Sequence, residues 1–355
     1  MNEPLLLKAL RREPVERPPI WLMRQAGRYM AEYRAVRESV SFLELCKKPE
    51  LCAEVMQTAV EKIGVDAAII FSDLLPILEP TGFNLSYEVG DGPVISNPFR
   101  ESNDLARVRE LEDVSPLDFV FKTVEATKRA VAPLPVIGFA GAPFTLAGYV
   151  IEGGTSRQFL RTKALMYSQP DVWKELLGRL ARSSARYLNA QIASGAQVVQ
   201  IFDSWIGCLG VEDFRRFVLP SLKELRSTLT PGVPVIYFGT GNPALLSSFA
   251  EVGTDCVGVD WRVPLEDAWK TIGYDRAVQG NLDPCVLLAS KDAIRREALR
   301  ILDAVGDRPG FIFNLGHGIL KDSPVENVAY LVQIVKNWRR NVPRPTFNND
   351  ETSTL

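Results

Sequence analysis

Short apolar runs recur along the chain, and amphipathic stretches separate most of them. Each run is rich in branched or aromatic residues and has the length of a buried strand. Eight strands are predicted: 18–24, 67–74, 134–143, 196–205, 233–241, 256–262, 277–284 and 311–318. Strands that alternate with helices are typical of parallel β/α units. The pattern therefore predicts an α/β fold, a single (β/α)8 barrel of the TIM type.

The stretches between the runs have helical periodicity. Apolar residues recur at helical spacing in 171–194 and in 291–306, and 323–340 closes the series. The 355 residues suffice for one barrel, since such barrels commonly take roughly 250 residues or more. We expect one domain over residues 1–342, with an N-terminal extension before the first strand. Residues 343–355 lack apolar periodicity and are expected to form a flexible tail.

The interval 75–133 is too long for one crossover helix. It contains SYEVGDGPVISNP, which favours a hairpin that turns at Gly90, Asp91 and Gly92. We interpret this interval as a hairpin-containing insertion after the second strand and not as a separate domain.

Residues 130–151 carry no charge and are long enough to cross a bilayer. Three prolines and three glycines would repeatedly break a helix there, so the stretch favours a buried strand followed by a special loop. The N-terminal apolar run is too short for a secretory signal. These features predict a protein that does not enter membranes.

Charge and cysteine content narrow the classes of partner and compartment. The 41 basic and 43 acidic side chains leave a net charge of −2, which offers no global field for nucleic acid or an anionic membrane. The five cysteines are scattered and never spaced as C-x-x-C, which favours neither a disulfide framework nor a zinc knuckle. A reducing compartment fits best, and we expect a cytoplasmic protein.

In barrels of this type, the site lies at the C-terminal ends of the strands. The residues predicted there are Arg24, Ser72, Asp73, Gly141, Asp203, Ser204, Gly239, Thr240, Asp260, Asn281, Asp283 and His317. No nucleotide-binding glycine motif or H-E-x-x-H motif accompanies them. His317 with three of the aspartates is a conceivable metal site, but strand-end carboxylates usually have arginine or backbone partners. No lysine ends a strand, which disfavours Schiff-base chemistry. We expect no cofactor and no metal.

Asp73 and His317 each allow two interpretations. Asp73 follows an apolar run and precedes two leucines, so its carboxylate is either a partly desolvated functional group or the N-cap of the next helix. His317 lies between glycines, where the backbone can approach a ligand, but a hydrogen-bonded loop histidine is an equal alternative. Tyr149 and Ser204 are weaker candidates.

The arginines of WLMRQAGRYMAEYRAVRE (21–38) indicate an anion site. Arg24 ends the first predicted strand, and Gly27 interrupts the segment after it. Arg28 and Arg34 each have a glutamate four residues later and can form helix pairs. Arg24 has no such partner. Two guanidiniums at the mouth of a barrel favour binding of carboxylates or phosphates.

The run PPIWLMRQAGRYMAEYR resembles the N-terminal signature of the uroporphyrinogen decarboxylase family. The likeness continues in the family's order through AAIIFSDLL, GFAGAPFTLAGYVIEGG, IFDSW, VDW, VQGNLDP and FNLGHGI, along nearly the whole chain. The resemblance implies a (β/α)8 barrel, usually a homodimer, without a metal, nucleotide or prosthetic group. It also implies an enzyme that removes carbon dioxide from all four acetate arms of uroporphyrinogen III and leaves coproporphyrinogen III in haem biosynthesis.

The same resemblance assigns roles to individual positions. It makes a substrate-binding loop of Arg24, Gln25, Ala26, Gly27 and Arg28. It makes Asp73 the central carboxylate, which contacts the pyrrole NH groups and stabilises the transition state. It assigns Tyr149, Ser204 and His317 to holding the carboxylate arms of the substrate.

Arg24 is the second catalytic candidate, because the resemblance places it near the reacting ring. Its guanidinium is a poor acid, with a pKa above about 12. An ordered water or a neighbouring substrate carboxyl is the alternative proton donor.

Two other functions remain open at the level of sequence. Some corrinoid-dependent methyltransferases share this barrel, but they hold zinc with His and Cys ligands. The only pairing here is His317 with Cys208 or Cys256. The other alternative is a catalytically silent tetrapyrrole carrier that retains the arginines.

Overall fold

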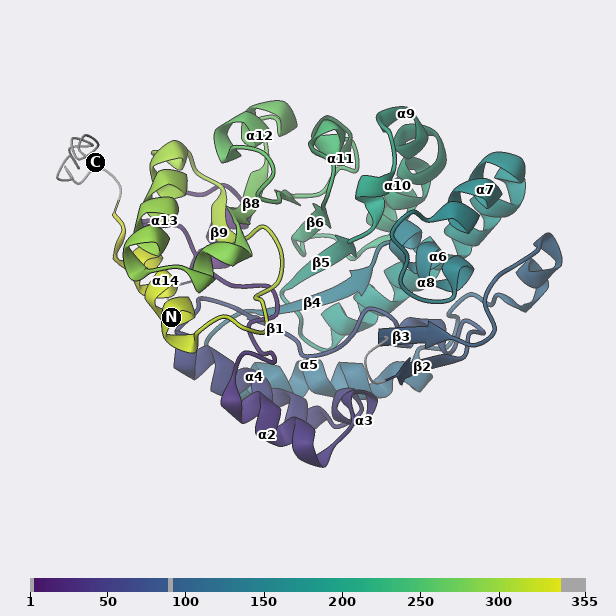
Figure 1. Ribbon diagram of the computed structural model, residues 1–355, viewed down its shortest axis with the longest axis horizontal. Helices are drawn as coiled ribbons and strands as arrows, with labels where there is room; N and C mark the ends of the chain where they lie inside the picture. Colours follow the sequence, from purple (N-terminus) through teal and green to yellow (C-terminus); the bar gives the residue numbers. More distant parts are fainter. Residues whose placement is uncertain (1–2, 89–91, 340–355) are drawn as a thin grey trace, which may run out of the picture.

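Seven parallel strands form a curled sheet in the computed structural model, which describes residues 3–88 and 92–339. The order is β1-β4-β5-β6-β7-β8-β9, so each strand pairs with the next one in this series. The strands lie at the centre of the molecule and helices surround them (Figure 1). Their bounds are β1 (Ala68–Ile69), β4 (Val136–Gly141), β5 (Val198–Asp203), β6 (Val235–Gly239), β7 (Cys256–Gly258), β8 (Ala277–Leu282) and β9 (Phe311–Leu315).

The helices cover the outside of the sheet. The α-helices are α1 (Leu5–Leu10), α2 (Ala31–Ser39), α3 (Phe42–Cys46), α4 (Pro49–Ile63), α5 (Asp118–Ala130), α6 (Pro143–Glu152), α7 (Leu160–Ser168), α8 (Pro170–Ala193), α9 (Val211–Asp213), α10 (Leu219–Thr228), α11 (Leu246–Ala250), α12 (Leu265–Ile272), α13 (Lys291–Val305) and α14 (Val325–Asn337). Short helical turns are η1 (Pro76–Leu78), η2 (Ser102–Arg107), η3 (Ser115–Leu117), η4 (Ile206–Cys208), η5 (Phe214–Val218), η6 (Pro243–Leu245) and η7 (Pro284–Leu288). The three helices predicted at 171–194, 291–306 and 323–340 are confirmed as α8, α13 and α14.

Seven of the eight predicted strands are confirmed, and the first is wrong. Residues 18–24 contribute only a parallel bridge between Ile20 and Phe313 of β9. Pro18 and Pro19 have no N–H to donate to a neighbouring strand. Arg24 has a φ of 62°, which turns the chain out of the extended conformation. The segment therefore lies along β9 without forming a ladder.

The uncharged stretch 130–151 forms β4 and then helix α6, so the predicted loop after the strand is wrong. Pro143 is the first residue of α6, where a missing N–H costs nothing. The prolines therefore lie outside the helix interior. Within the described residues, no helix is long and apolar enough to span a membrane.

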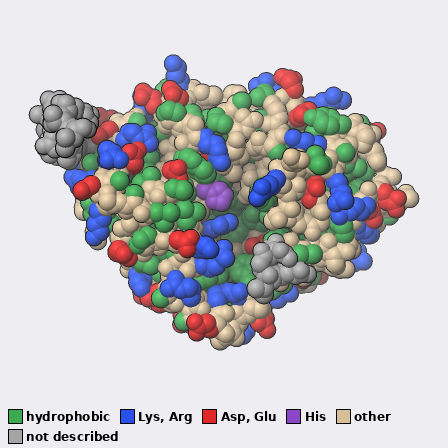
Figure 2. Space-filling model, viewed as in Figure 1, with side chains coloured by type: hydrophobic (Ala, Val, Ile, Leu, Met, Phe, Trp, Pro, Cys, Tyr) green, Lys and Arg blue, Asp and Glu red, His purple; other side chains and the backbone are tan. Residues whose placement is uncertain are grey.

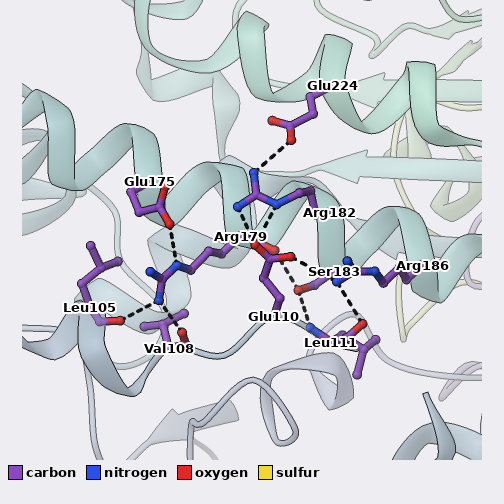
Figure 3. Close-up of polar contacts among 10 residues, drawn as sticks. All are labelled: Leu105, Val108, Glu110, Leu111, Glu175, Arg179, Arg182, Ser183, Arg186 and Glu224. Atoms are coloured by element: carbon purple, nitrogen blue, oxygen red, sulfur yellow. Dashed lines mark hydrogen bonds and ion pairs between the residues drawn. The ribbon is translucent and has the colours of Figure 1, made fainter. Parts of the chain in front are cut away.

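An antiparallel pair, β2 (Leu85–Glu88) and β3 (Gly92–Ile95), lies in the interval predicted as an insertion. Of the predicted turn, Gly90 and Asp91 lie outside the described residues, as does the predicted tail 343–355. The later part of this interval is fastened to α8 (Figure 3). Arg182 and Arg186 both bind the carboxylate of Glu110, and Arg179 donates to two backbone carbonyls of the segment 105–111.

Asp66, just before β1, fixes the segment that leads to Arg24. Arg17 donates two hydrogen bonds to its carboxylate, at 2.7 and 2.8 Å, and the Ile20 backbone N–H donates a third at 2.9 Å. The Asp66 N–H donates in turn to the Ile20 carbonyl at 2.8 Å. The two side chains are only 9% and 11% exposed, so solvent screens this pair weakly.

We expect Asp66→Asn to lower the free energy of unfolding by about 3 kcal/mol, because it leaves the buried Arg17 guanidinium without an opposite charge. Urea unfolding measures this loss. Glu50→Gln is the control, because Glu50 and Arg129 form an ion pair whose side chains are 82% and 66% exposed. Its loss should cost less than about 1 kcal/mol. Equal effects of the two substitutions would contradict a structural role for Asp66.

Candidate active site

The face of the molecule at the C-terminal ends of the strands is hollowed (Figure 2). The chain's one histidine, His317, lies beside the hollow, and Lys and Arg side chains line it. An open cavity of about 550 Å³ is lined by Arg28, Tyr33, Arg34, Arg37, Glu38, Lys321 and Asp322. Four of these side chains are cationic and two are anionic. This part of the face therefore favours an anionic ligand.

Asp73 lies four residues after β1 and is half-buried. Its Oδ1 accepts hydrogen bonds from the Tyr87 hydroxyl at 2.6 Å and from the Leu75 backbone N–H at 3.0 Å. Burial raises the pKa of Asp73, while these two hydrogen bonds and the charge of Arg24 oppose the rise. Leu75, and not Asp73, is the residue at the N-terminus of η1. Asp73 therefore stabilises a turn and also faces a charged neighbour.

Arg24 interacts with several of the other predicted site residues. Its side chain is exposed at the surface, and its stem packs so closely on Gly318 that a β-carbon there would lie 2.4 Å from the Arg24 Cδ. Its charge acts on Asp73, Tyr149 and His317. The structure thus brings four residues from separate parts of the chain into one electrostatic neighbourhood.

His317 follows β9 and is partly buried. Burial lowers its pKa to about 4, and the nearby charges of Arg24 and Arg262 act in the same direction. The imidazole is therefore neutral near pH 7 in the free protein. A neutral imidazole can donate one hydrogen bond and accept another, but it is not a ready source of a proton.

Tyr149 and Ser204 lie close to Trp205. Tyr149, on α6, packs edge-to-face on the Trp205 ring at 5.7 Å between centroids, and burial raises its pKa to about 12. Ser204 follows β5 and is half-buried. Its hydroxyl makes no hydrogen bond to any of the other predicted site residues that the structure describes. The contacts therefore do not connect Ser204 directly to the group formed by Arg24, Asp73, Tyr149 and His317.

The loop between Arg24 and Arg28 turns inward. Gln25 is fully buried; its side chain donates to the Ala67 carbonyl at 3.1 Å and accepts from the Leu22 N–H at 3.3 Å. Ala26 is buried as well, and a β-carbon at Gly27 would lie 3.1 Å from the Arg24 carbonyl. These three residues shape the loop, while Arg24 and Arg28 present their side chains to solvent.

The glutamates of α2 do not neutralise the arginines of the opening segment. Glu32 pairs with Lys62, and Arg34 donates to the backbone carbonyls of Arg28 and Tyr29 at 2.9 and 3.0 Å. Neither Arg28 with Glu32 nor Arg34 with Glu38 is an ion pair among the described residues. The interpretation of these arginines as ordinary helix pairs is therefore wrong.

Several residues of this face were missing from the predicted set, chiefly Tyr87, Arg37, Lys321 and Arg262. Arg37 belongs to the same arginine-rich stretch, and Lys321 follows His317 closely, so sequence proximity could have suggested both. Tyr87 offered no such signal, because its contact with Asp73 spans a hairpin.

The other strand-end carboxylates have structural partners. Asp203, fully buried, accepts from the hydroxyls of Thr145 and Tyr237 at 2.7 and 2.8 Å, and burial raises its pKa to about 6. Asp260 accepts from Thr240 and the Gly241 N–H and pairs with Arg262. In the described ranges, no group of three or more His, Cys, Asp and Glu side chains is arranged to hold a metal ion.

The sequence of this chain is similar to those of known proteins over nearly its whole length. The model of the family described as uroporphyrinogen decarboxylase (URO-D) matches residues 1–338. Proteins with the name uroporphyrinogen decarboxylase from Carboxydothermus hydrogenoformans and Chloroflexus aggregans are 51% and 50% identical. The first alignment covers 94% of this chain and 96% of the relative, and the second covers 96% of each.

The likeness to solved structures is more distant. A methyltransferase from Methanosarcina mazei superimposes with a TM-score of 0.81 at 22% identity, covering 94% of this chain and 99% of the other. That likeness concerns the fold alone. A family match over nearly the whole length, together with relatives at half identity, decides the assignment: this chain belongs to the uroporphyrinogen decarboxylase family.

Proposed function

We propose that this protein is a carboxy-lyase that converts uroporphyrinogen III into coproporphyrinogen III by removing the carboxyl groups of its four acetate arms. The observation that carries the proposal is one central carboxylate, Asp73, facing Arg24 at a rim rich in cations. A substrate with eight carboxylates and four pyrrole NH groups matches both features. The half-identical relatives support the same reaction.

The substrate supplies its own electron sink, so the proposed reaction uses neither a metal nor an organic cofactor. Protonation of a pyrrole carbon makes the ring cationic, and the bond to the carboxylate carbon then breaks with its electron pair moving into the ring. Carbon dioxide leaves and an exocyclic methylene remains on a neutral ring. A second proton converts this methylene into a methyl group, and the ring carbon then releases the proton that it first accepted, which restores the aromatic ring. One preorganised charged contact to such a developing charge contributes roughly 3 to 4 kcal/mol.

In this proposal Asp73 accepts from the pyrrole NH groups and stabilises the cation as it forms. The substrate's carboxylate arms contact the 24–28 loop, especially Arg24 and Arg28, as well as Tyr149, Ser204 and neutral His317. Arg24 also lies where the first proton is delivered. An ordered water or a substrate carboxyl is the alternative donor, because a guanidinium is a weak acid.

We also propose that residues 1–342 form a single domain in which 18–24 closes the barrel as its eighth member. The parallel bridge from Ile20 to β9 and the hydrogen bonds between Ile20 and Asp66 before β1 support closure. A homodimer is the proposed assembly, as the family resemblance implies, and the scattered cysteines favour a cytoplasmic location.

The direct test is anaerobic incubation of the purified protein with uroporphyrinogen III under reducing conditions, with chromatography of the products. Coproporphyrinogen and the partly decarboxylated intermediates are expected, and activity should survive dialysis against a chelator. Binding without product would indicate a carrier. Stoichiometric zinc with methyl transfer would indicate the related methyltransferase chemistry instead.

Asp73→Asn should lower kcat about a hundredfold or more with little change in product affinity, because a neutral amide stabilises a cation poorly. Steady-state kinetics and a thermal melt of the variant measure the two effects separately. A lower melting temperature with normal turnover would show that Asp73 only stabilises its turn.

His317→Asn should weaken substrate binding and leave measurable decarboxylation, since the neutral imidazole is assigned to holding the substrate. Its stability should also depend less on pH. In the unfolded chain the pKa of His317 has its ordinary value of 6.5, whereas in the folded protein it is about 4. Between these values the unfolded chain binds more protons, so the wild type loses stability as pH falls from 6.5 towards 4. Unfolding at several pH values measures this difference. Lost turnover with unchanged binding would make His317 an obligatory acid.

Arg24→Lys and Arg28→Lys should each weaken binding of the bound carboxylates by roughly 1.5 to 3 kcal/mol, because lysine cannot donate two parallel hydrogen bonds. The losses should be larger on the octacarboxylate than on intermediates with fewer carboxylates. The double variant should be non-additive if both side chains contact one ligand. Salt should weaken binding by the wild type. Equal losses on all substrates would place the anion-binding groups elsewhere.

A further inference from the structure

The Tyr87 hydroxyl binds one oxygen of the Asp73 carboxylate and not the other. Tyr87 lies on β2, fourteen positions after Asp73, and its hydroxyl donates to Asp73 Oδ1 at 2.6 Å. The Leu75 N–H donates to the same oxygen at 3.0 Å. Neither bond falls on Oδ2. The carboxylate is therefore oriented by two donors on Oδ1, and no side chain among the described residues donates to Oδ2.

The Tyr87 ring is fixed by an aromatic cluster formed by Tyr33, Phe42, Phe71 and Tyr87. Tyr87 packs against Phe42 at 5.2 Å between centroids, and Phe42 packs against Phe71 at 6.2 Å. Tyr33 contacts Phe71 at 5.6 Å. The Arg37 guanidinium lies 5.7 Å from the centre of the Phe42 ring. The cluster thus connects the hairpin strand to the segment that carries the arginines of the site.

The hairpin is also fastened on its other side. Tyr87 pairs with Pro93 in the β2–β3 register, and β3 reaches the residues that end α6. Val94 forms an antiparallel bridge with Gly154, and the Ile95 N–H donates to the Gly153 carbonyl at 2.9 Å. Helix α6 carries Tyr149, which faces Asp73. The Tyr87 hydroxyl is therefore positioned by contacts of the hairpin with two parts of the site, the segment that carries the arginines and the end of helix α6.

We propose that Tyr87 is a positioning residue for the decarboxylation: its hydroxyl keeps Asp73 an oriented carboxylate, with Oδ2 directed to the pyrrole NH groups. The inference rests on the role proposed above for Asp73. Tyr87 acts only through Asp73 and contacts no reacting atom.

The surroundings of Asp73 explain why the Tyr87 hydroxyl affects the pKa of its carboxyl group. Burial disfavours the charged carboxylate, and the titratable groups that face it are Arg24, Cys46 of α3, Tyr87, Tyr149 and Tyr187 of α8. Of these side chains, Tyr87 and Arg24 lower the Asp73 pKa. Removal of the hydroxyl raises that pKa, so a smaller fraction of Asp73 is ionised at a given pH.

Tyr87→Phe keeps the ring and its contact with Phe42 and removes only the donor. We expect kcat at neutral pH to fall about tenfold, within the range for a hydrogen bond to a charged group. KM should change little. The acidic limb of the kcat–pH profile should move to higher pH, which a merely structural role would not produce. Tyr167→Phe is the matched control. Tyr167 lies on the exposed surface of α7, and its hydroxyl donates to Asp213. Removal of this hydroxyl should leave kcat and the kcat–pH profile unchanged.

The same substitution in the Asp73→Asn background separates this inference from the proposed function. If Tyr87 acts through Asp73, the double variant should have the same rate as Asp73→Asn. A further tenfold loss in that background, or a Tyr87→Phe enzyme with the wild-type rate and pH profile, would overturn the role of Tyr87 while Asp73 keeps its own. Normal turnover by Asp73→Asn would instead overturn the proposed site. A thermal melt excludes unfolding of either variant as the cause.

Discussion

The buried pair of Asp66 and Arg17 determines where the chain enters the site. The Asp66 carboxylate accepts three hydrogen bonds, two from the Arg17 guanidinium and one from the Ile20 backbone. A charge in such surroundings is stable only when it is fully paired. The segment after Arg17 must therefore run between Asp66 and β9, and four residues beyond Ile20 it ends at Arg24. The position of Arg24, the proposed substrate-binding arginine, follows from a pairing at some distance from it.

Polar side chains on the inner side of the curled sheet reinforce this placement. Trp21 donates to Gln279, and Gln279 donates to Gln200, at 2.8 and 3.1 Å; all three are buried. The Met23 N–H donates to Asn314 at 3.1 Å. A buried amide without a partner costs about 1 to 3 kcal/mol. A shift of the 18–24 segment by one residue would break these contacts together. The interior of the curled sheet and the loop that begins at Arg24 therefore share one register.

The sequence predicts most of the strands because their alternation with helices is a local property. It wrongly predicts a strand at 18–24. The turn at Arg24 depends on packing against Gly318, which is far away in the chain. Arg24 and Asp73 could be recognised as candidates from their places at or near the ends of predicted strands. Asp203 also lies at the end of a predicted strand, but its carboxylate accepts hydrogen bonds from Thr145 and Tyr237. These structural contacts form only when the strands lie side by side in the fold. Tyr87 escaped recognition for the same reason.

The arrangement of charge fits the order of events in the proposed reaction. Cations at the rim attract an anionic substrate, although the chain as a whole has a net charge of −2. Asp73 is a negative group on the same face, so it repels the carboxylate arms and favours the NH side of the macrocycle. His317, which also interacts with Arg24, is neutral near pH 7 and adds no positive charge to this face. The carboxylate therefore becomes most stabilising when the ring turns cationic, which is the condition for lowering a barrier rather than binding the substrate more tightly.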